Sequence, residues 1–315
     1  MKAIDALKET AAYLENYGIE SPEKEAELLI RHGLNIDSVE IYRDNPELNE
    51  ECIKTVKEML QRRLSREPLQ YILGYVEFLG LRLAIGRGVL IPRPETEMMA
   101  EYAIKTARSQ KLEVRSQKSE VRIRNTDNCQ LSTVNRQQFT ILDLCTGSGC
   151  LALALAKEFP DALVYGTDIS ENAIESAKKN AELNCINNAT FLKGSLFEPI
   201  EKLFTIHYSL FTFDLIVSNP PYIRTRDIKS LQPEIRDWEP ADALDGGADG
   251  LDFYRKLIPA SRQFLKDNGI LMLEVGAGQS DDVADIIKSL GFARIETIKD
   301  YAGIKRIVKA RWTRL

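Results

Sequence analysis

The second half of the sequence alternates between short apolar runs and helical patterns, and this alternation limits the folds open to the chain. The apolar runs are Thr140–Leu144, Leu163–Thr167, Ala189–Lys193, Phe213–Ser218 and Gly269–Val275. Such a β-α order is typical of a doubly wound parallel sheet. After Gly291, the segments Ala293–Ile298 and Ile304–Trp312 flank a turn, which predicts a closing antiparallel hairpin. The sequence therefore predicts an α/β domain with a Rossmann-like doubly wound sheet and a terminal antiparallel hairpin.

The first seventy residues follow helical spacing instead. Ser21 followed by Pro22 signals a helix start, and Gly33 lies where a C-terminal glycine is expected. A longer helix is predicted farther on, because four apolar residues share one face: Ile53, Val56, Leu60 and Leu64. We therefore expect a small N-terminal helical domain.

The domain boundaries follow from these patterns and from the length of 315 residues, which favours two domains. We predict a helical domain at residues 1–70, a hairpin linker at 71–90 and the sheet domain at 91–315. The heptad at residues 109–115 is repeated almost unchanged at 116–122, and polar residues follow it. Residues 107–138 are therefore predicted to be a flexible surface insertion without a function of its own.

Composition excludes several classes of protein. The net charge of −5 argues against a protein that coats nucleic acid. A local basic run on one predicted helix is more often a solvated face; it comprises Lys57, Arg62, Arg63 and Arg66. The five cysteines form no C-x-x-C pair, and no apolar stretch is long enough to span a membrane. We therefore expect a cytoplasmic protein with no metal site, no membrane association and no nucleic-acid partner.

A glycine-containing loop follows the first predicted strand of the sheet domain. Gly147 and Gly149 let the backbone turn sharply and let a ligand approach closely. This string fits a nucleotide-like cofactor, and it also fits a tight structural turn. Asp168 ends the next strand, where a carboxylate can accept both hydroxyl hydrogens of a ribose. An N-cap for the helix after Ser170 is the alternative interpretation of Asp168.

The motif Asn219-Pro220-Pro221-Tyr222 follows the fourth strand of the sheet. Two prolines fix the backbone, so a planar NH2 group could donate to the Asn219 side-chain oxygen and to the Pro220 carbonyl, with Tyr222 against its plane. A carboxamide nitrogen is a poor nucleophile, and two fixed acceptors would aim its lone pair at the methyl group of a sulfonium. An ordinary turn after a strand is the other interpretation.

With these residues in place, the sequence resembles the HemK/PrmC family of release-factor glutamine methyltransferases. The resemblance covers most of the chain outside the insertion. It includes the Asn219–Tyr222 motif and five further segments, which are Glu25–Leu29, Pro68–Gly74, Ile91–Glu97, Glu239–Leu244 and Gly246–Leu251. The resemblance implies a class I methyltransferase fold with S-adenosyl-L-methionine as cofactor and S-adenosyl-L-homocysteine as product.

The resemblance also implies a substrate and roles for single residues. The substrate would be the glutamine of the Gly-Gly-Gln motif in class 1 peptide-chain release factors, and the helical domain would dock this protein. Asn219, Pro220, Pro221 and Tyr222 would form the catalytic site, and Asn219 would also border the cofactor. The other cofactor-binding residues would be Cys145, Thr146, Gly147, Ser148 and Gly149 at the methionine end, Asp168 at the ribose, and Ser195 with Leu196 at the adenine.

Two residues depart from the family pattern. Cys145 stands where glycine is usual, and a cysteine fits there only if the position does not require positive φ. Ser195 stands where an acidic residue is common, which would weaken a bond to the adenine amino group. The segment around Arg93 and Glu95 has two interpretations, as a wall of the active site or as a helix start with salt bridges.

Two other functions compete with glutamine methylation. The Asn219 side-chain oxygen and the Pro220 carbonyl, with Tyr222 beside them, form what we call the amide clamp. This clamp would also suit the amino group of adenine, but an adenine-N6 methyltransferase of DNA or RNA needs a base-flipping pocket and a basic groove. The net charge of −5 and the helical N-terminal block argue against it. A non-catalytic cofactor-binding module is the second alternative, and the intact Asn219–Tyr222 motif argues against that one.

Overall fold

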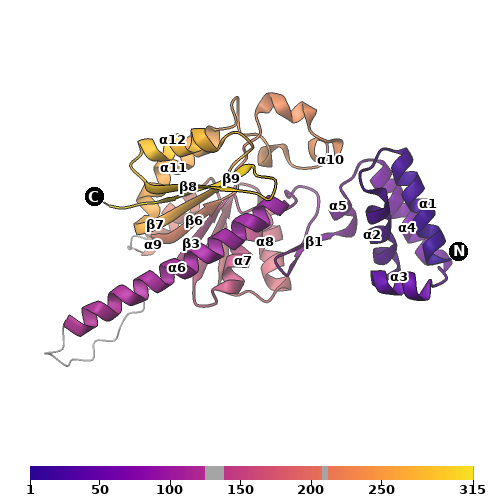
Figure 1. The fold of residues 1–315 in the computed structure, drawn as a ribbon, viewed down its shortest axis with the longest axis horizontal. Coiled ribbons are helices and arrows are strands. Elements are labelled where there is room, and N and C mark those ends of the chain that lie inside the picture. The colour runs from indigo at the N-terminus through magenta and orange to yellow at the C-terminus, as the bar shows by residue number, and fades with distance from the viewer. Residues whose placement is uncertain (125–137, 208–211, 315) are drawn as a thin grey trace. The chain divides into compact units, whose positions relative to one another are not determined.

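The computed structural model describes residues 1–124, 138–207 and 212–314. The chain divides into two compact units (Figure 1). The first unit comprises Met1–Tyr75, Ile85–Arg87 and Ser230–Glu239, and the second comprises Val76–Ala84, Gly88–Lys229 and Pro240–Leu315.

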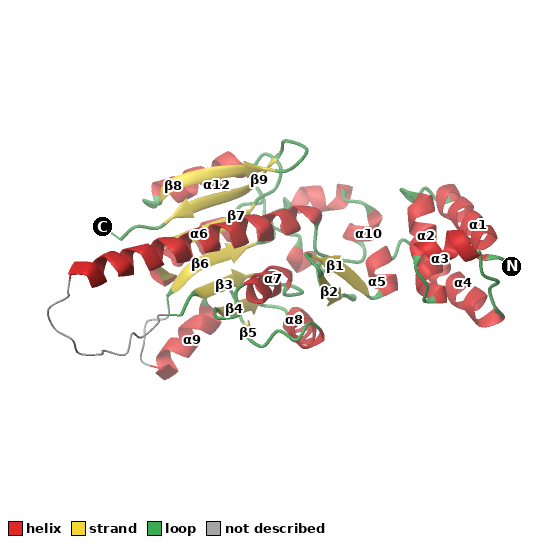
Figure 2. Cartoon of the chain, turned by 60° about the horizontal axis from the view of Figure 1, so that its bottom comes forward, coloured by secondary structure: helices red, strands yellow, loops and turns green. Residues whose placement is uncertain are grey.

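A seven-stranded sheet forms the centre of the second unit (Figure 2). Its strands are β3 (Thr140–Leu144), β4 (Leu163–Asp168), β5 (Ala189–Lys193), β6 (Phe213–Ser218), β7 (Leu265–Glu274), β8 (Ala293–Lys299) and β9 (Lys305–Arg311). Their order is β5-β4-β3-β6-β7-β9-β8, and only β9 runs antiparallel to its neighbours. The predicted doubly wound sheet with a terminal antiparallel hairpin is confirmed. The last parallel strand begins earlier than expected, at Leu265.

Helices cover both faces of this sheet because its buried strands are apolar on both sides. Leu215 and Val217 of β6 share one core cluster with apolar residues of α6 (Pro94–Arg124), α7 (Cys150–Glu158) and α8 (Glu171–Leu183). Ile216, between them in sequence, belongs to the opposite cluster with α9 (Glu198–His207), α11 (Asp252–Phe264) and α12 (Ser280–Ser289). The two-residue period of the strand therefore distributes its side chains between two cores.

Shorter elements complete the second unit. A two-stranded sheet is formed by β1 (Tyr75–Phe78) and β2 (Leu81–Ala84), within the predicted linker. Asn180 of α8 is fully buried and holds the end of β2, because its Oδ1 accepts from the Ala84 backbone N–H at 2.7 Å. Two 3₁₀ helices follow β6, η1 (Thr225–Ser230) and η2 (Ala241–Ala243).

The first unit is helical, as predicted. It contains α1 (Ala3–Asn16), α2 (Pro22–Leu34), α3 (Ser38–Asp44), α4 (Glu50–Leu64), α5 (Leu69–Leu73) and the short α10 (Pro233–Arg236). The expected role of Gly33 was wrong, since α2 continues past it and Asn35 is the left-handed C-cap. A Cβ atom on Gly33 would lie 2.7 Å from Val56 of α4, so this glycine permits close packing of the two helices.

The basic run on α4 is only partly a solvated face. Lys57 and Arg62 are exposed, as expected, but Arg63 is buried. The Arg63 guanidinium pairs with Glu25 of α2 at 2.6 Å and with Glu234 of α10 at 3.0 Å. Arg66 reaches the same Glu234 oxygen at 3.0 Å. The prediction was wrong for these two arginines because two acidic side chains from other helices compensate their charge.

The predicted insertion differs from expectation at its start. Helix α6 continues through the duplicated heptad as far as Arg124, so residues 107–124 are helical. Ala107 and Gln110 are buried, and the Gln110 amide donates to the Asp214 carbonyl at 3.0 Å and to the Asn268 carbonyl at 3.2 Å. Residues 125–137 of the predicted insertion lie outside the described residues. No helix in the described part of the chain is both long and apolar enough to cross a membrane.

Candidate active site

The predicted cofactor loop and the Asn219–Tyr222 motif follow adjacent strands. Leu144 at the end of β3 pairs with Thr167 of β4 on one side and with Ser218 of β6 on the other. The strand order reverses between β3 and β6, and ligands of doubly wound sheets bind outside the carboxyl ends of the strands at such a point. The topology therefore brings both motifs and Asp168 to one edge of the sheet.

The cofactor loop contains three residues in the left-handed region, Cys145 (φ 59°), Gly147 (φ 55°) and Gly149 (φ 82°). The condition set for Cys145 is therefore not met, because the position does require positive φ and a cysteine adopts it at a cost in strain. A Cβ atom on Gly149 would lie 3.0 Å from the Ala177 Cβ, whereas one on Gly147 would meet no atom within 4 Å. Gly147 consequently borders open space where a ligand can approach the backbone.

Asp143, in β3 just before the loop, accepts hydrogen bonds that hold the loop in place. Its Oδ2 accepts from the Thr146 hydroxyl at 2.6 Å and from the Ala152 N–H at 3.2 Å. Burial raises the pKa of this carboxyl to about 7. The Asn180 amide donates to the Ser148 carbonyl at 3.0 Å, and the Thr146 N–H bonds to β4. The loop is therefore fixed in shape by its own buried contacts before any ligand binds.

Asp168 ends β4 beside this loop. Its Oδ2 accepts from the Gly147 N–H at 2.9 Å and its Oδ1 accepts from the Ser170 N–H at 2.9 Å. Ser170, not Asp168, is the N-cap of α8, since its hydroxyl accepts from the Ala173 N–H. Burial raises the pKa of Asp168. Each carboxylate oxygen has lone pairs to spare after these bonds, which suits two ribose hydroxyls.

Ser195 and Leu196 follow β5 and lie next to the same edge. The Gly194 N–H donates to the Asp168 carbonyl at 2.9 Å, and the Leu196 carbonyl accepts from the Thr167 hydroxyl at 2.8 Å. Ser195 is exposed and Leu196 is half-buried. Together with the open space at Gly147, these positions fit an adenosine-containing cofactor along the ends of β3, β4 and β5.

Asn219 begins the motif after β6 and is held by residues distant in sequence. Its Nδ2 donates to the Thr96 hydroxyl of α6 at 3.1 Å, and this hydroxyl donates to Glu274 Oε2 of β7 at 2.8 Å. The Tyr222 hydroxyl lies 3.4 Å from Glu274 Oε1. No hydrogen bond from the described residues reaches Asn219 Oδ1 or the Pro220 carbonyl. Both acceptors that the amide clamp requires are therefore available.

Comparison with known proteins identifies the family. Residues 5–74 match the PrmC N-terminal domain, and residues 135–274 match a methyltransferase domain. A release factor glutamine methyltransferase of Thermodesulfovibrio yellowstonii is 42% identical over 98% of this chain and 97% of its own length. Another, of Geobacter sulfurreducens, is 40% identical over 96% of this chain and 94% of its own length. The chain belongs to the release factor glutamine methyltransferase family.

The fold of this family member is therefore the class I methyltransferase fold, as its strand order also indicates. The described residues include no group of three or more side chains suited to hold a metal ion.

The Gly246–Leu251 segment, given above only as a family match, contacts the Asn219–Tyr222 motif. The Gly246 N–H donates to the Ile223 carbonyl at 2.8 Å, and a Cβ atom on Gly246 would lie 2.7 Å from the Tyr222 Cα. Gln279, which sequence reasoning missed, donates to the Tyr222 carbonyl at 2.9 Å and accepts from the Gly276 N–H at 3.0 Å. The backbone after the two prolines is therefore held from two sides.

The segment around Arg93 and Glu95 supplies two kinds of contact. Glu95 forms a salt bridge with Arg306 of β9 at 3.4 Å, which agrees with the salt-bridge interpretation. Thr96, the next residue, contacts Asn219 as described above. Sequence reasoning noticed this segment but missed the role of Thr96 and of Glu274, because 123 residues separate Thr96 from Asn219.

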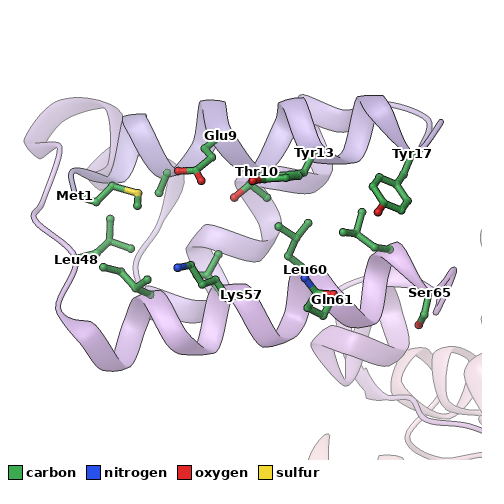
Figure 3. A pocket seen from close by; sticks show the side chains of 14 residues that line it. Met1, Glu9, Thr10, Tyr13, Tyr17, Leu48, Lys57, Leu60, Gln61 and Ser65 are labelled. Atoms are coloured by element: carbon green, nitrogen blue, oxygen red, sulfur yellow. The ribbon is translucent and has the colours of Figure 1, made fainter.

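The helical unit carries a groove of about 530 Å³ between α1 and α4 (Figure 3). Tyr13 of α1 and Tyr17, the residue that follows α1, face Leu60 of α4 across it, and both tyrosines are exposed. Lys57 and Gln61 add polar groups along the α4 side. Exposed aromatic side chains beside apolar ones are typical of protein-binding surfaces.

Proposed function

We propose that this protein transfers a methyl group from S-adenosyl-L-methionine to the side-chain amide nitrogen of a glutamine, and that this glutamine lies in the Gly-Gly-Gln motif of class 1 peptide-chain release factors. The observation that carries the proposal is the fixed Asn219 carboxamide, whose Oδ1 is available beside the Pro220 carbonyl. Membership of the family, whose relatives carry this activity in their names, supports the same substrate.

The clamp residues act on the nucleophile. Asn219 Oδ1 and the Pro220 carbonyl each accept one N–H of the glutamine amide, while the Tyr222 ring lies against its plane. Pro221 fixes the backbone between them. The two acceptors polarise the amide nitrogen through its two N–H groups. They also hold the group in one orientation, so that the nitrogen lone pair points toward the methyl group. Because the acceptors are already fixed by the protein, little reorganisation is needed at the moment of reaction.

The cofactor side of the site binds and orients. Asp168 would hold the ribose, Ser195 and Leu196 would border the adenine, and residues 145–149 would hold the methionine end. When bound, the cofactor would supply a methyl group on a positively charged sulfur. The amide nitrogen would form the new N–C bond, the S–C electron pair would stay on sulfur to leave the neutral thioether of S-adenosyl-L-homocysteine, and one amide proton would pass to solvent water. Asn219 at the end of β6 would border both reactants.

The α1–α4 groove supports a protein substrate. Its exposed Tyr13 and Tyr17 offer apolar area with polar tips, which suits a folded partner better than a small molecule. We assign this groove to the docking of the release factor. A substrate that takes part in translation would place the enzyme in the cytoplasm.

A mass-spectrometric assay tests the proposed function. Purified release factor is incubated with the protein and S-adenosyl-L-methionine, and the peptide that contains the Gly-Gly-Gln motif is analysed. We expect the mass gain of one CH2 group on the glutamine. A release factor variant with asparagine in place of that glutamine is the matched control. Methylation of adenine in DNA or RNA, with none on the release factor, would contradict the proposed substrate, and no methylation of either would favour a non-catalytic module.

A further inference from the structure

We propose that Thr96 and Glu274 are positioning residues, which determine the end of the Asn219 carboxamide that faces the substrate. This inference rests on the proposed function, because it concerns the acceptor that Asn219 offers to the glutamine amide. It adds two side chains, one from α6 and one from β7, to the amide clamp of residues 219–222.

The direction of the hydrogen bonds follows from a count of protons. A threonine hydroxyl has one proton, and an ionised carboxylate can only accept. The Thr96 hydroxyl lies 2.8 Å from Glu274 Oε2, so its proton points toward Glu274. Its lone pairs then remain for Asn219, and only the NH2 end of that carboxamide can donate to them, at 3.1 Å. Asn219 Oδ1 must therefore face away from Thr96.

The burial of Thr96 and Glu274 indicates that Glu274 has a role other than stabilising the fold. Thr96 is 2% exposed and Glu274 is 1% exposed. A buried carboxylate is costly to the fold, and an apolar residue would fill the end of β7 at less cost. Only a group without donors fixes the Thr96 proton in one direction, which an amide or hydroxyl at this position would not do. The presence of Glu274 is thus explained by orientation of Asn219 better than by stability.

The surroundings of Glu274 decide its protonation. Burial raises its pKa to about 7, with a further increase from Glu95, while the hydrogen bonds from Thr96 and Tyr222 and the charge of Arg306 lower it. Tyr254 of α11, whose hydroxyl donates to the Glu274 carbonyl, and Cys150 of α7 are further titratable groups near it. A protonated Glu274 can donate to Thr96, which frees the Thr96 proton to meet the Asn219 oxygen. Activity should therefore rise as the pH passes upward through about 7.

Four variants test this arrangement in the full-length protein, with release factor as substrate. Thr96→Val keeps the shape and removes the hydroxyl, Thr96→Ser restores it, and Glu274→Gln removes the ionisation. Thr140→Val is the matched control, because Thr140 is also buried and its hydroxyl also contacts a carboxylate, Asp214 at 3.1 Å, at the opposite end of β3. The measurements are kcat, KM, the pH profile of kcat/KM, the melting temperature, and cofactor affinity by calorimetry.

We expect Thr96→Val to lower kcat by about tenfold to a hundredfold, since misplacement of a reacting group has an effect of this size. Its cofactor affinity should stay within about threefold of the wild type and its melting temperature should match that of Thr140→Val. Thr96→Ser should recover most of kcat, Thr140→Val should keep it, and Glu274→Gln should remove the rise of kcat/KM near pH 7.

Three results would overturn the inference while the wild type methylates release factor. In the first, Thr96→Val has the same kcat as the wild type. In the second, Thr96→Val and Thr140→Val lose kcat equally. In the third, Thr96→Ser has a kcat as low as that of Thr96→Val. An unchanged pH profile in Glu274→Gln would remove Glu274 from the proposal. An inactive wild type would instead contradict the proposed function, so the two failures are distinguishable.

Discussion

The cofactor loop after β3 and the amide clamp after β6 occupy the same edge of one sheet but are built in different ways. The loop is held mostly by nearer residues: Asp143 accepts from Thr146 and Ala152, three and nine residues away, and Asn180 is 32 residues from Ser148, to which it donates. The clamp is held by distant residues, since Asn219 contacts Thr96 and Tyr222 contacts Gln279, 123 and 57 residues away. A motif can therefore be complete in sequence while the groups that orient it lie elsewhere.

The two regions should also fail differently when they are altered. In the proposed mechanism, the loop and Asp168 present fixed groups to a cofactor, so damage there should reduce binding. The clamp, in the same proposal, presents acceptors to a nucleophile, so damage there should reduce turnover. Variants of the two regions should therefore separate cofactor affinity from turnover.

Asn219→Ala should have the largest effect. Removal of a preorganised hydrogen-bonding group from a reacting centre lowers kcat by about a hundredfold to a thousandfold, and we expect a loss of that order. Affinity for S-adenosyl-L-methionine should stay within about threefold, as measured by calorimetry. Asn187→Ala, at an exposed asparagine after α8, is the control. Equal loss of affinity and turnover would show that Asn219 serves mainly to bind the cofactor.

Asp168→Ala should show the opposite pattern. Hydrogen bonds to a charged group contribute about 1.5–3 kcal/mol, so cofactor affinity should fall by about tenfold to a hundredfold. At saturating cofactor, kcat should remain within about fivefold of the wild type. Asp161→Ala, at an exposed aspartate after α7, controls for the charge. Normal cofactor binding by this variant would contradict the ribose-binding role, and would mean that Asp168 serves only to bond Gly147 and Ser170.

The pH dependence of stability compares the two regions directly, because Asp143 in the loop region and Glu274 beside the clamp are both buried acids. Burial raises the pKa of Asp143 from 3.8 to about 7 and that of Glu274 from 4.5 to about 7. Between the two values the folded protein retains a proton that the unfolded chain has lost. The free energy of unfolding should therefore fall as the pH rises from about 4 to about 7, and stay level above that.

Asp143→Asn and Glu274→Gln should each remove part of this fall, by at most about 3 kcal/mol over the interval from about pH 5 to about pH 8. Denaturant unfolding at about pH 5 and about pH 8 measures the difference for each variant and the wild type. A fall as steep as that of the wild type in both variants would mean that other groups cause it.

Sequence patterns were sufficient for the sheet because its strands are short, apolar and separated by helical spacing. The limits of β3 and β6 were predicted to the residue. Patterns failed where tertiary partners decide the outcome. Gly33 lies inside α2 because α4 packs against it, and Arg63 is buried because Glu25 and Glu234 come to it from other helices. Neither partner can be read from the local sequence.

The site shows the same limit. The loop residues, Asp168 and Asn219 were predicted from motifs, and their roles stay predictions until the variants are measured. Thr96 and Glu274 were missed because each looks ordinary in its own segment, a threonine in the first turn of α6 and an acidic residue at the end of β7. Their interest arises only from the fold, which places Thr96 against Asn219 and Glu274 against Thr96.

Cys145→Gly should have the smallest effect and tests whether the loop is as self-contained as its contacts indicate. Glycine adopts the observed φ of 59° without strain, which should raise the free energy of unfolding by about 1–2 kcal/mol. Glycine also makes the unfolded chain more flexible, which should lower the free energy of unfolding by about 0.5–1 kcal/mol. The net change should be a small rise in melting temperature, measured by calorimetry. Because Asp143, Thr146 and Asn180 still hold the loop, cofactor affinity and kcat should stay within about twofold. A loss of turnover without a loss of affinity would show instead that the Cys145 side chain takes part in orienting the reactants, and that loop and clamp are not separate devices.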